Sequence, residues 1–213
     1  MTTETTATVA TTIDQQPITR ALTILDPYSY LVVAGWKPIE NRTWIPRGPD
    51  GESPFRGRIA IHTSKSPKLF RDHDLLDGIL DIDPQDRIAA AMDDDRIRED
   101  GRHLFHLGYI VGSVEVVDVV TLPGLEIPVK DLLAILAKQP TPSSFAATIP
   151  QERWVESNVL FILRNPRRYR RAIPAGGKQG LWRLNEHQRK MIIDAERDLI
   201  PQDDPGCPAE RAG

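Results

Sequence analysis

The pattern of hydrophobic and polar positions predicts short strands separated by helices and by long irregular segments. Runs rich in β-branched and other apolar residues, some of them alternating with polar ones, are typical of strands. They lie at 21–25, 58–63, 109–120, 159–164 and 180–184. Strands and helices do not alternate regularly and no glycine-rich phosphate loop is present, which argues against a doubly wound nucleotide-binding fold. We expect an α+β fold, a small and partly open mixed β-barrel of five to six strands decorated by helices.

Capping signals mark two of the expected helices. Asp26 followed by Pro27 is typical of an N-cap with proline in the first helical turn, and Gly35 is well placed to end that helix. Asn185 is expected to cap a last helix, with Gln188 three residues later as its capping-box partner. Further helical patterns cover 66–100 and 130–138.

The composition divides the chain into one domain with two tails. The threonine-rich residues 1–19 are predicted to be a disordered N-terminal tail. Residues 20–198 form the expected domain, which contains a helical insert at about 66–105. Residues 199–213 are predicted to be a C-terminal tail.

Several classes of protein are excluded by what the sequence lacks. No apolar run approaches the roughly 18 residues that a membrane helix needs, and the first 20 residues have no signal-peptide character. We therefore expect a cytoplasmic protein that does not contact membranes. The single cysteine, Cys207, excludes an internal disulfide and a cysteine-based zinc site. The histidines show no HExxH-type spacing, so we predict no metal and no cofactor.

Charge is distributed unevenly along the chain, although the formal net charge is only −3. Between Asp72 and Asp100, eleven acidic residues accompany three arginines. Between Arg164 and Arg183, seven basic residues occur without an acidic one. Such blocks indicate partners rather than a fold. The basic block can meet phosphates, or it can face the acidic block or solvent.

The segment GWKPIENRTW, residues 35–44, is the most informative about function. If it is extended, Glu40, Arg42 and Trp44 point to the same side. Trp44 then offers a stacking face for a base, while Arg42 and Glu40 offer hydrogen-bond donors and an acceptor. Lys37 offers a charge for a phosphate, or a general base. The alternative is structural, with Glu40 and Arg42 as a salt bridge on the strand and Trp44 in the core.

Two residues farther along are candidates for the same site. His62 ends the strand RIAIHT, although a lone strand histidine is more often a hydrogen-bonding residue than a base or ligand. Glu115 lies among valines, and a buried carboxylate needs a partner, for which Lys37 or Arg42 would serve. The alternative for Glu115 is an exposed position at a sheet edge.

A basic run followed by glycines and a tryptophan, NPRRYRRAIPAGGKQGLWRL, lies near the C-terminus. A basic loop with an aromatic residue at its base is typical of the rim of a nucleic-acid-binding cleft. The ligand-binding candidates in this run are Arg167, Arg168, Lys178 and Trp182. The alternative is a strand that closes the barrel, with Trp182 in the core.

Four segments of the chain resemble, in this order, parts of one known family. LTILDPYSYLVVAGWKPIENRTW resembles an opening strand, a helix start and the motif Gly-x-Lys-x-x-Glu-x-Arg, which Gly35, Lys37, Glu40 and Arg42 fill. RGRIAIHTSKS, GYIVGSVEVVD and LRNPRRYRRAIPAGGKQGLWRL resemble the later strands. The family is the ASCH domain family of the PUA-like β-barrel superfamily, and the order of segments is similar to that of its EOLA-like branch. The resemblance implies a PUA-like barrel.

The resemblance also implies a cleft between the Lys37 segment and the closing strand, where members of the family are thought to bind RNA or nucleotide-like ligands. Some bacterial relatives remove the acetyl group from acetylated cytidine, using a lysine, a threonine three residues later and a distant glutamate. Lys37 matches that lysine, whereas Glu40 replaces the threonine. Glu152 and Glu156 are candidates for the glutamate. Other relatives are linked to cleavage of single-stranded RNA.

Three hypotheses follow. The first is a monomeric binding module that holds a base or short single-stranded RNA in a cleft lined by Lys37, Glu40 and Arg42. The second is an amidohydrolase acting on a modified nucleoside, or a single-strand ribonuclease, with Lys37 as general base and Glu40 or Glu115 positioning it. The third is a protein-interaction domain with a vestigial cleft, whose acidic segment around Asp93, Asp94 and Asp95 binds a basic partner or mimics nucleic acid. Because Glu40 replaces threonine, the first hypothesis is favoured.

Overall fold

The computed structural model describes residues 17–66, 107–124, 127–139 and 151–200. Within these residues, no helix has the length and apolar character needed to cross a membrane. The elements, in chain order, are β1 (Arg20–Ile24), α1 (Tyr28–Val33), β2 (Ile39–Arg42), β3 (Gly57–Thr63), β4 (Tyr109–Thr121), α5 (Val129–Leu136), the 3₁₀ helix η4 (Gln151–Trp154), β5 (Val159–Pro174), β6 (Leu181–Arg183), α6 (Glu186–Ala195) and β7 (Leu199–Ile200).

The predicted tails and insert lie largely outside the described residues: 1–16, 67–106 and 201–213 are not described. At both ends the described structure extends slightly beyond the predicted domain. Ile18 is buried, and the carbonyl group of Thr19 accepts a hydrogen bond from the N–H of Leu184. At the other end, β7 pairs with β5.

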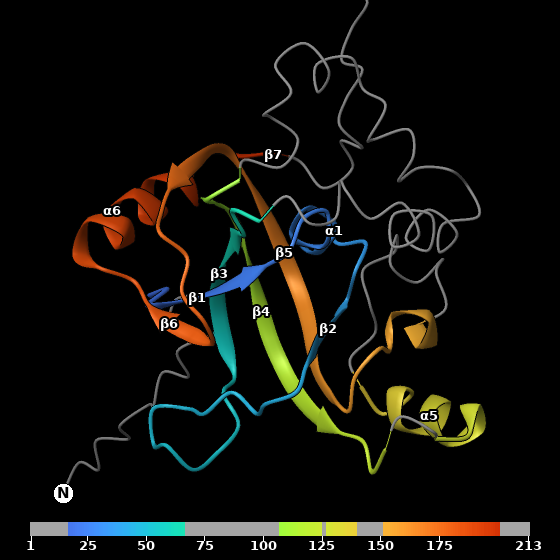
Figure 1. Cartoon of the computed structure of the whole chain (residues 1–213). Helices are drawn as coiled ribbons and strands as arrows, with labels where there is room; N and C mark the ends of the chain where they lie inside the picture. The colour runs from blue at the N-terminus through green and yellow to red at the C-terminus, as the bar shows by residue number, and fades with distance from the viewer. Residues whose placement is uncertain (1–16, 67–106, 125–126, 140–150, 201–213) are drawn as a thin grey trace, which may run out of the picture.

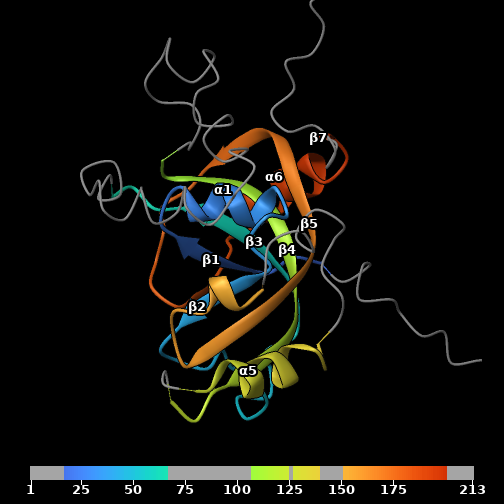
Figure 2. The ribbon, with the colours of Figure 1, turned by 90° about the vertical axis from the view of Figure 1, so that its right-hand side faces the viewer.

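The strands form one mixed sheet that curls into a half-barrel (Figure 1). Six strands follow the order β2-β5-β4-β3-β1-β6, and the short β7 pairs with β5. Seen from the side, α1 lies toward one end of this half-barrel and α5 toward the other (Figure 2). The predicted α+β fold, a small mixed barrel decorated by helices, is confirmed.

One parallel pair of strands creates the edge at which the site lies. β1 and β3 are parallel, whereas the other strand pairs of the described sheet are antiparallel. Thr23 lies beside His62 and Ile24 beside Thr63. Because parallel strands end at the same edge of a sheet, the segments that follow β1 and β3 leave it together. A hydrogen bond of 2.8 Å from the N–H of Ser64 to the carbonyl group of Ile24 joins them.

The hydrophobic core has three parts. α1 and α5 cover one cluster that contains Trp36 and the fully buried Trp154. A second cluster lies between α1 and the strands β1, β3, β4 and β5, and includes Phe161. A third cluster lies between the sheet and α6 and includes Tyr169 and Trp182. Trp182 is only 5% exposed and belongs to this cluster, as the core alternative for this residue expects.

The start of α1 differs from the expected N-cap. Pro27 rather than Asp26 is the capping residue, and no side chain caps the helix. Instead, Oδ1 of Asp26 accepts a hydrogen bond of 3.1 Å from Oγ of Ser29, and burial raises the pKa of Asp26 to about 9. The capping box between Asn185 and Gln188 at the start of α6 is confirmed.

β5 is longer than the predicted strand and continues through the basic run to Pro174. It can do so because β4 extends to thirteen residues and pairs with it along its length. The basic run is therefore strand rather than loop. The loop between β5 and β6 is confined to residues 175–180.

Gly112 in β4 is a point of close approach between layers. A Cβ atom added there would lie 2.2 Å from the carbonyl oxygen of Arg167 in β5 and 2.7 Å from Cγ1 of Val33 in α1. Both neighbours are held by secondary structure, so only glycine allows α1 and β5 to lie this close to β4.

We expect Gly112→Ala to lower the free energy of unfolding by about 1–3 kcal/mol, because either α1 or β5 must shift to admit the methyl group. Urea denaturation followed by circular dichroism measures this change. Gly124→Ala is the matched control, since no atom of the described residues lies within 4 Å of a Cβ added at that position. Equal stability of the two variants would contradict the tight packing.

Candidate functional site

A buried chain of charges forms the centre of the candidate site. The side chain of Lys37, only 2% exposed, donates hydrogen bonds from Nζ to Oε2 of Glu40 at 3.0 Å and to the carbonyl group of Ile39. The other carboxylate oxygen of Glu40, Oε1, lies 2.8 Å from the guanidinium group of Arg42. The three predicted residues Lys37, Glu40 and Arg42 are thus brought together.

Local backbone geometry explains this convergence. Gly35 has φ +80°, a left-handed conformation that ends α1 and that glycine adopts readily. The chain then enters β2, where alternation places the side chains of Glu40 and Arg42 on the same side. Lys37 lies just before the strand, and its side chain folds back toward Glu40, three residues later.

Two aromatic rings cover the ammonium group of Lys37. Its Nζ lies 5.3 Å from the ring centroid of Tyr28 and 5.9 Å from that of Trp154, within the range of cation–π attraction. Burial, together with the negative charges of Glu156 and Glu40, raises the pKa of Tyr28 to about 12, so its hydroxyl group stays protonated.

Trp44 lies beside Arg42 rather than over Lys37. Its half-buried ring packs edge-to-face on Phe161, with centroids 5.4 Å apart. The central guanidinium carbon of Arg42 lies 6.0 Å from the ring centroid of Trp44. Arg42 also donates a hydrogen bond of 2.8 Å to the carbonyl group of Thr23 in β1. Its Nε is buried and has no hydrogen-bond partner within the described part of the chain.

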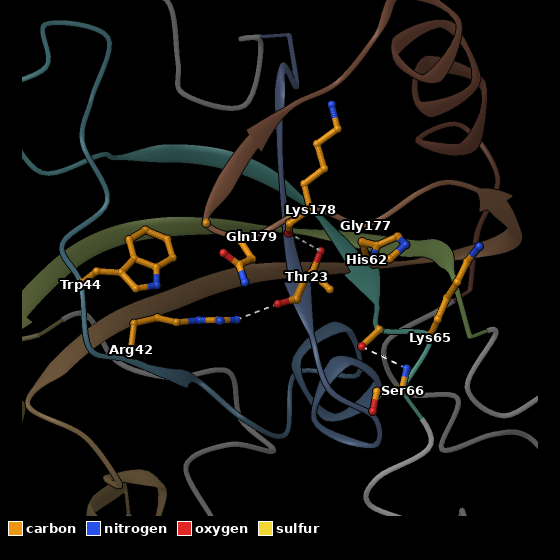
Figure 3. A pocket seen from close by; sticks show the side chains of 11 residues that line it. Thr23, Arg42, Trp44, His62, Lys65, Ser66, Gly177, Lys178 and Gln179 are labelled. Atoms are coloured by element: carbon orange, nitrogen blue, oxygen red, sulfur yellow. Dashed lines mark hydrogen bonds between the residues drawn. The ribbon is translucent and has the colours of Figure 1, made fainter.

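Two neighbouring cavities open beside these charges and share the lining residues Thr23, Arg42 and Ser64. The smaller, of about 290 Å³, is named here the lysine cavity, and its polar lining includes Tyr28, Lys37, Glu40, Asn41, Arg42 and Glu156. The larger, of about 760 Å³, is named the loop cavity, and it is lined by Thr23, Arg42, Trp44, His62, Ser64, Lys65, Ser66 and residues 177–180. In Figure 3, Trp44 and Arg42 lie at one end of the loop cavity and Lys65 and Ser66 at the other.

The two cavities differ in charge. The lysine cavity contains two cations, Lys37 and Arg42, and two carboxylates, Glu40 and Glu156. The described residues that line the loop cavity include three cationic side chains and no carboxylate. An anion is therefore favoured in the loop cavity, whereas neutral polar groups suit the lysine cavity.

A hydrogen-bonded wall separates the loop cavity from the core beneath α6. Nε1 of Trp182 donates to Oγ1 of Thr23 at 3.1 Å, and Oγ1 donates to the carbonyl group of Lys178 at 3.0 Å. The His62 ring packs edge-to-face on Trp182, and its Nε2 lies 3.1 Å from the carbonyl oxygen of Ala175. Burial lowers the pKa of His62, so the ring is neutral at pH 7 and donates from Nε2.

Gly177 allows the loop of residues 175–180 to pack closely against Thr23 and His62. A Cβ atom added at Gly177 would lie 2.4 Å from Cε1 of His62 and 3.0 Å from Oγ1 of Thr23. The backbone of the loop therefore lies directly against the two strand ends. Trp182 and His62 support the loop, and Lys178 projects from it (Figure 3).

Two basic candidates lie away from both cavities. The guanidinium group of Arg167 pairs with Glu196 of α6. The next residue, Arg168, lies over the ring of Tyr30 in α1, with its guanidinium carbon 4.9 Å from the centroid. Because β5 continues as a strand, adjacent side chains point to opposite faces. Neither residue lines the lysine cavity or the loop cavity, so a role for them as ligand contacts stays a prediction.

The position of Glu115 also differs from the expectation. It lies within β4, and its Oε2 accepts a hydrogen bond of 2.7 Å from Nδ2 of Asn165. Lys37 and Arg42, the partners expected for it, are both taken by Glu40. Glu115 lines neither cavity and does not position Lys37.

Several lining residues were not predicted as ligand contacts. Thr23, Ser64, Lys65 and Ser66 enter the site because β1 and β3 are parallel and end at one edge. The sequence SKS directly after β3 is a usable signal, but only once the neighbouring strand of β3 is known. Among the described residues, no group of His, Cys, Asp and Glu side chains is arranged to hold a metal ion.

We expect Glu40→Ala to lower the free energy of unfolding by about 3–5 kcal/mol, because Lys37 then stays buried without a carboxylate. Chemical denaturation measures the effect. The exposed Glu52 provides the control, and Glu52→Ala should change stability by no more than about 0.5 kcal/mol. The double variant Lys37→Met/Glu40→Gln removes both charges and should recover most of the loss. A Glu40→Ala protein as stable as Glu52→Ala would show that Lys37 does not need this partner.

Comparison of the sequence with family models and with curated proteins finds no match. Comparison of the structure finds the crystal structure of ASCH from Zymomonas mobilis, with 12% identity over 82% of this chain and 93% of that chain and a TM-score of 0.42. A tyrosine-to-phenylalanine variant of that protein gives 13% identity over 82% of this chain and 96% of that chain, with a TM-score of 0.41. The structural neighbours are thus ASCH proteins, the family whose motifs this sequence resembles.

Proposed function

We propose that this protein binds a nucleobase, as a nucleotide or within short single-stranded RNA, across the lysine and loop cavities. The observation that carries the proposal is the buried chain of Lys37, Glu40 and Arg42, which ends beside the half-buried ring of Trp44. An aromatic face, fixed hydrogen-bond donors and a cationic cavity are the groups that proteins use to hold unstacked bases.

Trp44 and Arg42 would make the main contacts with the base. Stacking of a base on an aromatic side chain contributes about 1–3 kcal/mol. One terminal nitrogen of Arg42, Nη2, is occupied by Glu40 and Thr23, which leaves the other terminal nitrogen, Nη1, as the donor for a carbonyl group of the ligand. The ring of Trp44 would therefore stack on the face of the base, and the guanidinium group of Arg42 would donate a hydrogen bond to the edge of the same base.

Lys37 and Glu40 would act mainly by positioning. Both oxygens of Glu40 accept from cations, so its first role is to hold Lys37 and Arg42. An ammonium group has three N–H donors, and Lys37 uses two of them on Ile39 and Glu40. The third would serve a carbonyl group of the base in the lysine cavity.

We expect Trp44→Ala and Arg42→Ala each to weaken binding of a labelled single-stranded RNA by about 5- to 150-fold, the equivalent of 1–3 kcal/mol. Fluorescence anisotropy at constant salt measures this. The control is Arg171→Ala, because Arg171 is exposed on β5 and lines neither cavity. Unchanged affinity in both site variants, or an equal loss in Arg171→Ala, would place the binding site elsewhere.

A second function, hydrolysis of a modified nucleoside such as acetylated cytidine or of single-stranded RNA, is favoured by one observation. Glu156 lines the same cavity as Lys37 and Glu40, which places a candidate glutamate near the lysine. Against it, Nζ of Lys37 is held in an ion pair with Glu40, and a lysine in such a pair has no lone pair with which to act as a general base.

For this reason we expect no turnover of acetylated cytidine or labelled single-stranded RNA above the background of the Lys37→Ala variant. Chromatography of the reaction products tests this. Turnover that disappears in both Lys37→Ala and Glu156→Gln would establish the hydrolase instead. Glu152→Gln is the control for the second variant, because Glu152 lies outside the lysine cavity.

A further inference from the structure

We infer that the loop cavity holds a phosphate group of the bound nucleotide between Lys65 and Lys178. This inference rests on the proposed function, because the base is taken to lie against Trp44 and Arg42. It assigns the phosphate to the segment that follows β3 and to the loop between β5 and β6, and not to the arginines of the basic run.

The contrast in charge between the two cavities is the first support. The described lining of the loop cavity carries Arg42, Lys65 and Lys178 without a carboxylate, while the lysine cavity balances two cations with two acids. A cavity lined by positive charges alone raises the local concentration of anions. An anionic part of the ligand therefore belongs in the loop cavity.

The second support is that neither lysine has a carboxylate partner within the part of the chain that the structure describes. Neither Lys65 nor Lys178 forms an ion pair with a carboxylate of the described residues, whereas Lys37 and Arg42 do. A lysine ammonium group is a compact point charge on a flexible arm, which suits a phosphate. Both lysines line the loop cavity, and Figure 3 shows their side chains extending from two different segments, Lys65 from the segment after β3 and Lys178 from the loop before β6.

Hydroxyl and amide groups complete the anion site. Oγ of Ser64 accepts a hydrogen bond of 3.2 Å from the N–H of Ser66, which leaves the Ser64 hydroxyl proton for donation. The N–H of Ser64 is fixed by the carbonyl group of Ile24, so the serine is held at the end of β3. Ser66 and Gln179 add further donors to the lining.

The loop that carries Lys178 is held in place. The carbonyl group of Lys178 accepts from Thr23, and the backbone at Gly177 lies against His62. Its main chain is thereby anchored to both parallel strands, while its side chain extends from the loop (Figure 3). The distance between the lysines can adjust through their side chains without moving the wall.

The cavity has room for this arrangement. Its volume of about 760 Å³ lies within the roughly 300–1,000 Å³ of small-molecule sites. Trp44 and Arg42 stand at one end and Lys65 and Ser66 at the other (Figure 3). A nucleotide lying across the cavity would place its base at the first end and its phosphate at the second.

The test compares ligands that differ only in phosphate. Isothermal titration calorimetry would measure the affinity of the folded full chain for the four ribonucleosides, for their 5′- and 3′-monophosphates and for dinucleotides with an internal phosphodiester. We expect one position of the phosphate to tighten binding by about tenfold or more over the nucleoside. The preferred form distinguishes a terminal phosphate from an internal one.

The next experiment substitutes Lys65 and Lys178 and leaves the proposed base contacts, Trp44 and Arg42, unchanged. In Lys65→Gln/Lys178→Gln, the gain from phosphate should fall to about twofold or less while affinity for the nucleoside stays unchanged. Lys138→Gln, an exposed lysine just after α5, is the matched control and should keep the full gain. Circular dichroism confirms that each variant is folded.

The outcomes separate the two proposals. If nucleosides bind and phosphate adds nothing, or if the gain survives in the double variant, the phosphate site is wrong and the proposed function stands. If no nucleoside or nucleotide binds, the proposed function is wrong and the phosphate site is wrong with it. If Arg42→Ala weakens binding of nucleosides and nucleotides alike while the lysine variant loses only the phosphate gain, both proposals hold.

Discussion

The ammonium group of Lys37 is the constraint on which the rest of the site depends. A charge buried this deeply is stable only beside an opposite charge and further polar groups, which Glu40 and the carbonyl group of Ile39 supply. Glu40 shares its second oxygen with Arg42, and Arg42 reaches the carbonyl group of Thr23 in β1. One buried charge therefore ties the segment after α1 to β1 and fixes Arg42 at the boundary between the two cavities.

The parallel pairing of β1 and β3 supplies the other half of the site. It brings the ends of two strands to one edge, where Thr23, His62 and Ser64 meet. The loop before β6 closes onto this edge because Gly177 carries no side chain to hold it away. The lysine cavity is thus built by the segment around β2, and the loop cavity by the strand ends and the loop, with Arg42 belonging to both.

The sequence predicted much of the fold, for reasons that can be named. β1, β3 and β4 carry apolar patterns strong enough to place them within a residue or two, and the capping box at Asn185 is a local signal. The length of β5 could not be predicted, since arginines continue a strand only where a partner such as β4 runs beside them. For that reason Arg167 and Arg168 were placed in a binding loop, although each packs on a different face of the strand.

The same division applies to the site. The convergence of Lys37, Glu40 and Arg42 was determined by the sequence itself, because a helix end and a period of two bring residues so close in sequence to one side. The rings over Lys37 and the residues of the loop cavity were decided by the tertiary structure. Trp154 is far from Lys37 in sequence and Lys178 is far from Arg42, and only contacts between distant segments bring Trp154 over Lys37 and place Lys178 in the same cavity as Arg42. Hydrophobic periodicity determines which way side chains point over a few consecutive residues. A cavity is formed by segments that are distant in sequence, and no local pattern indicates which segments become neighbours.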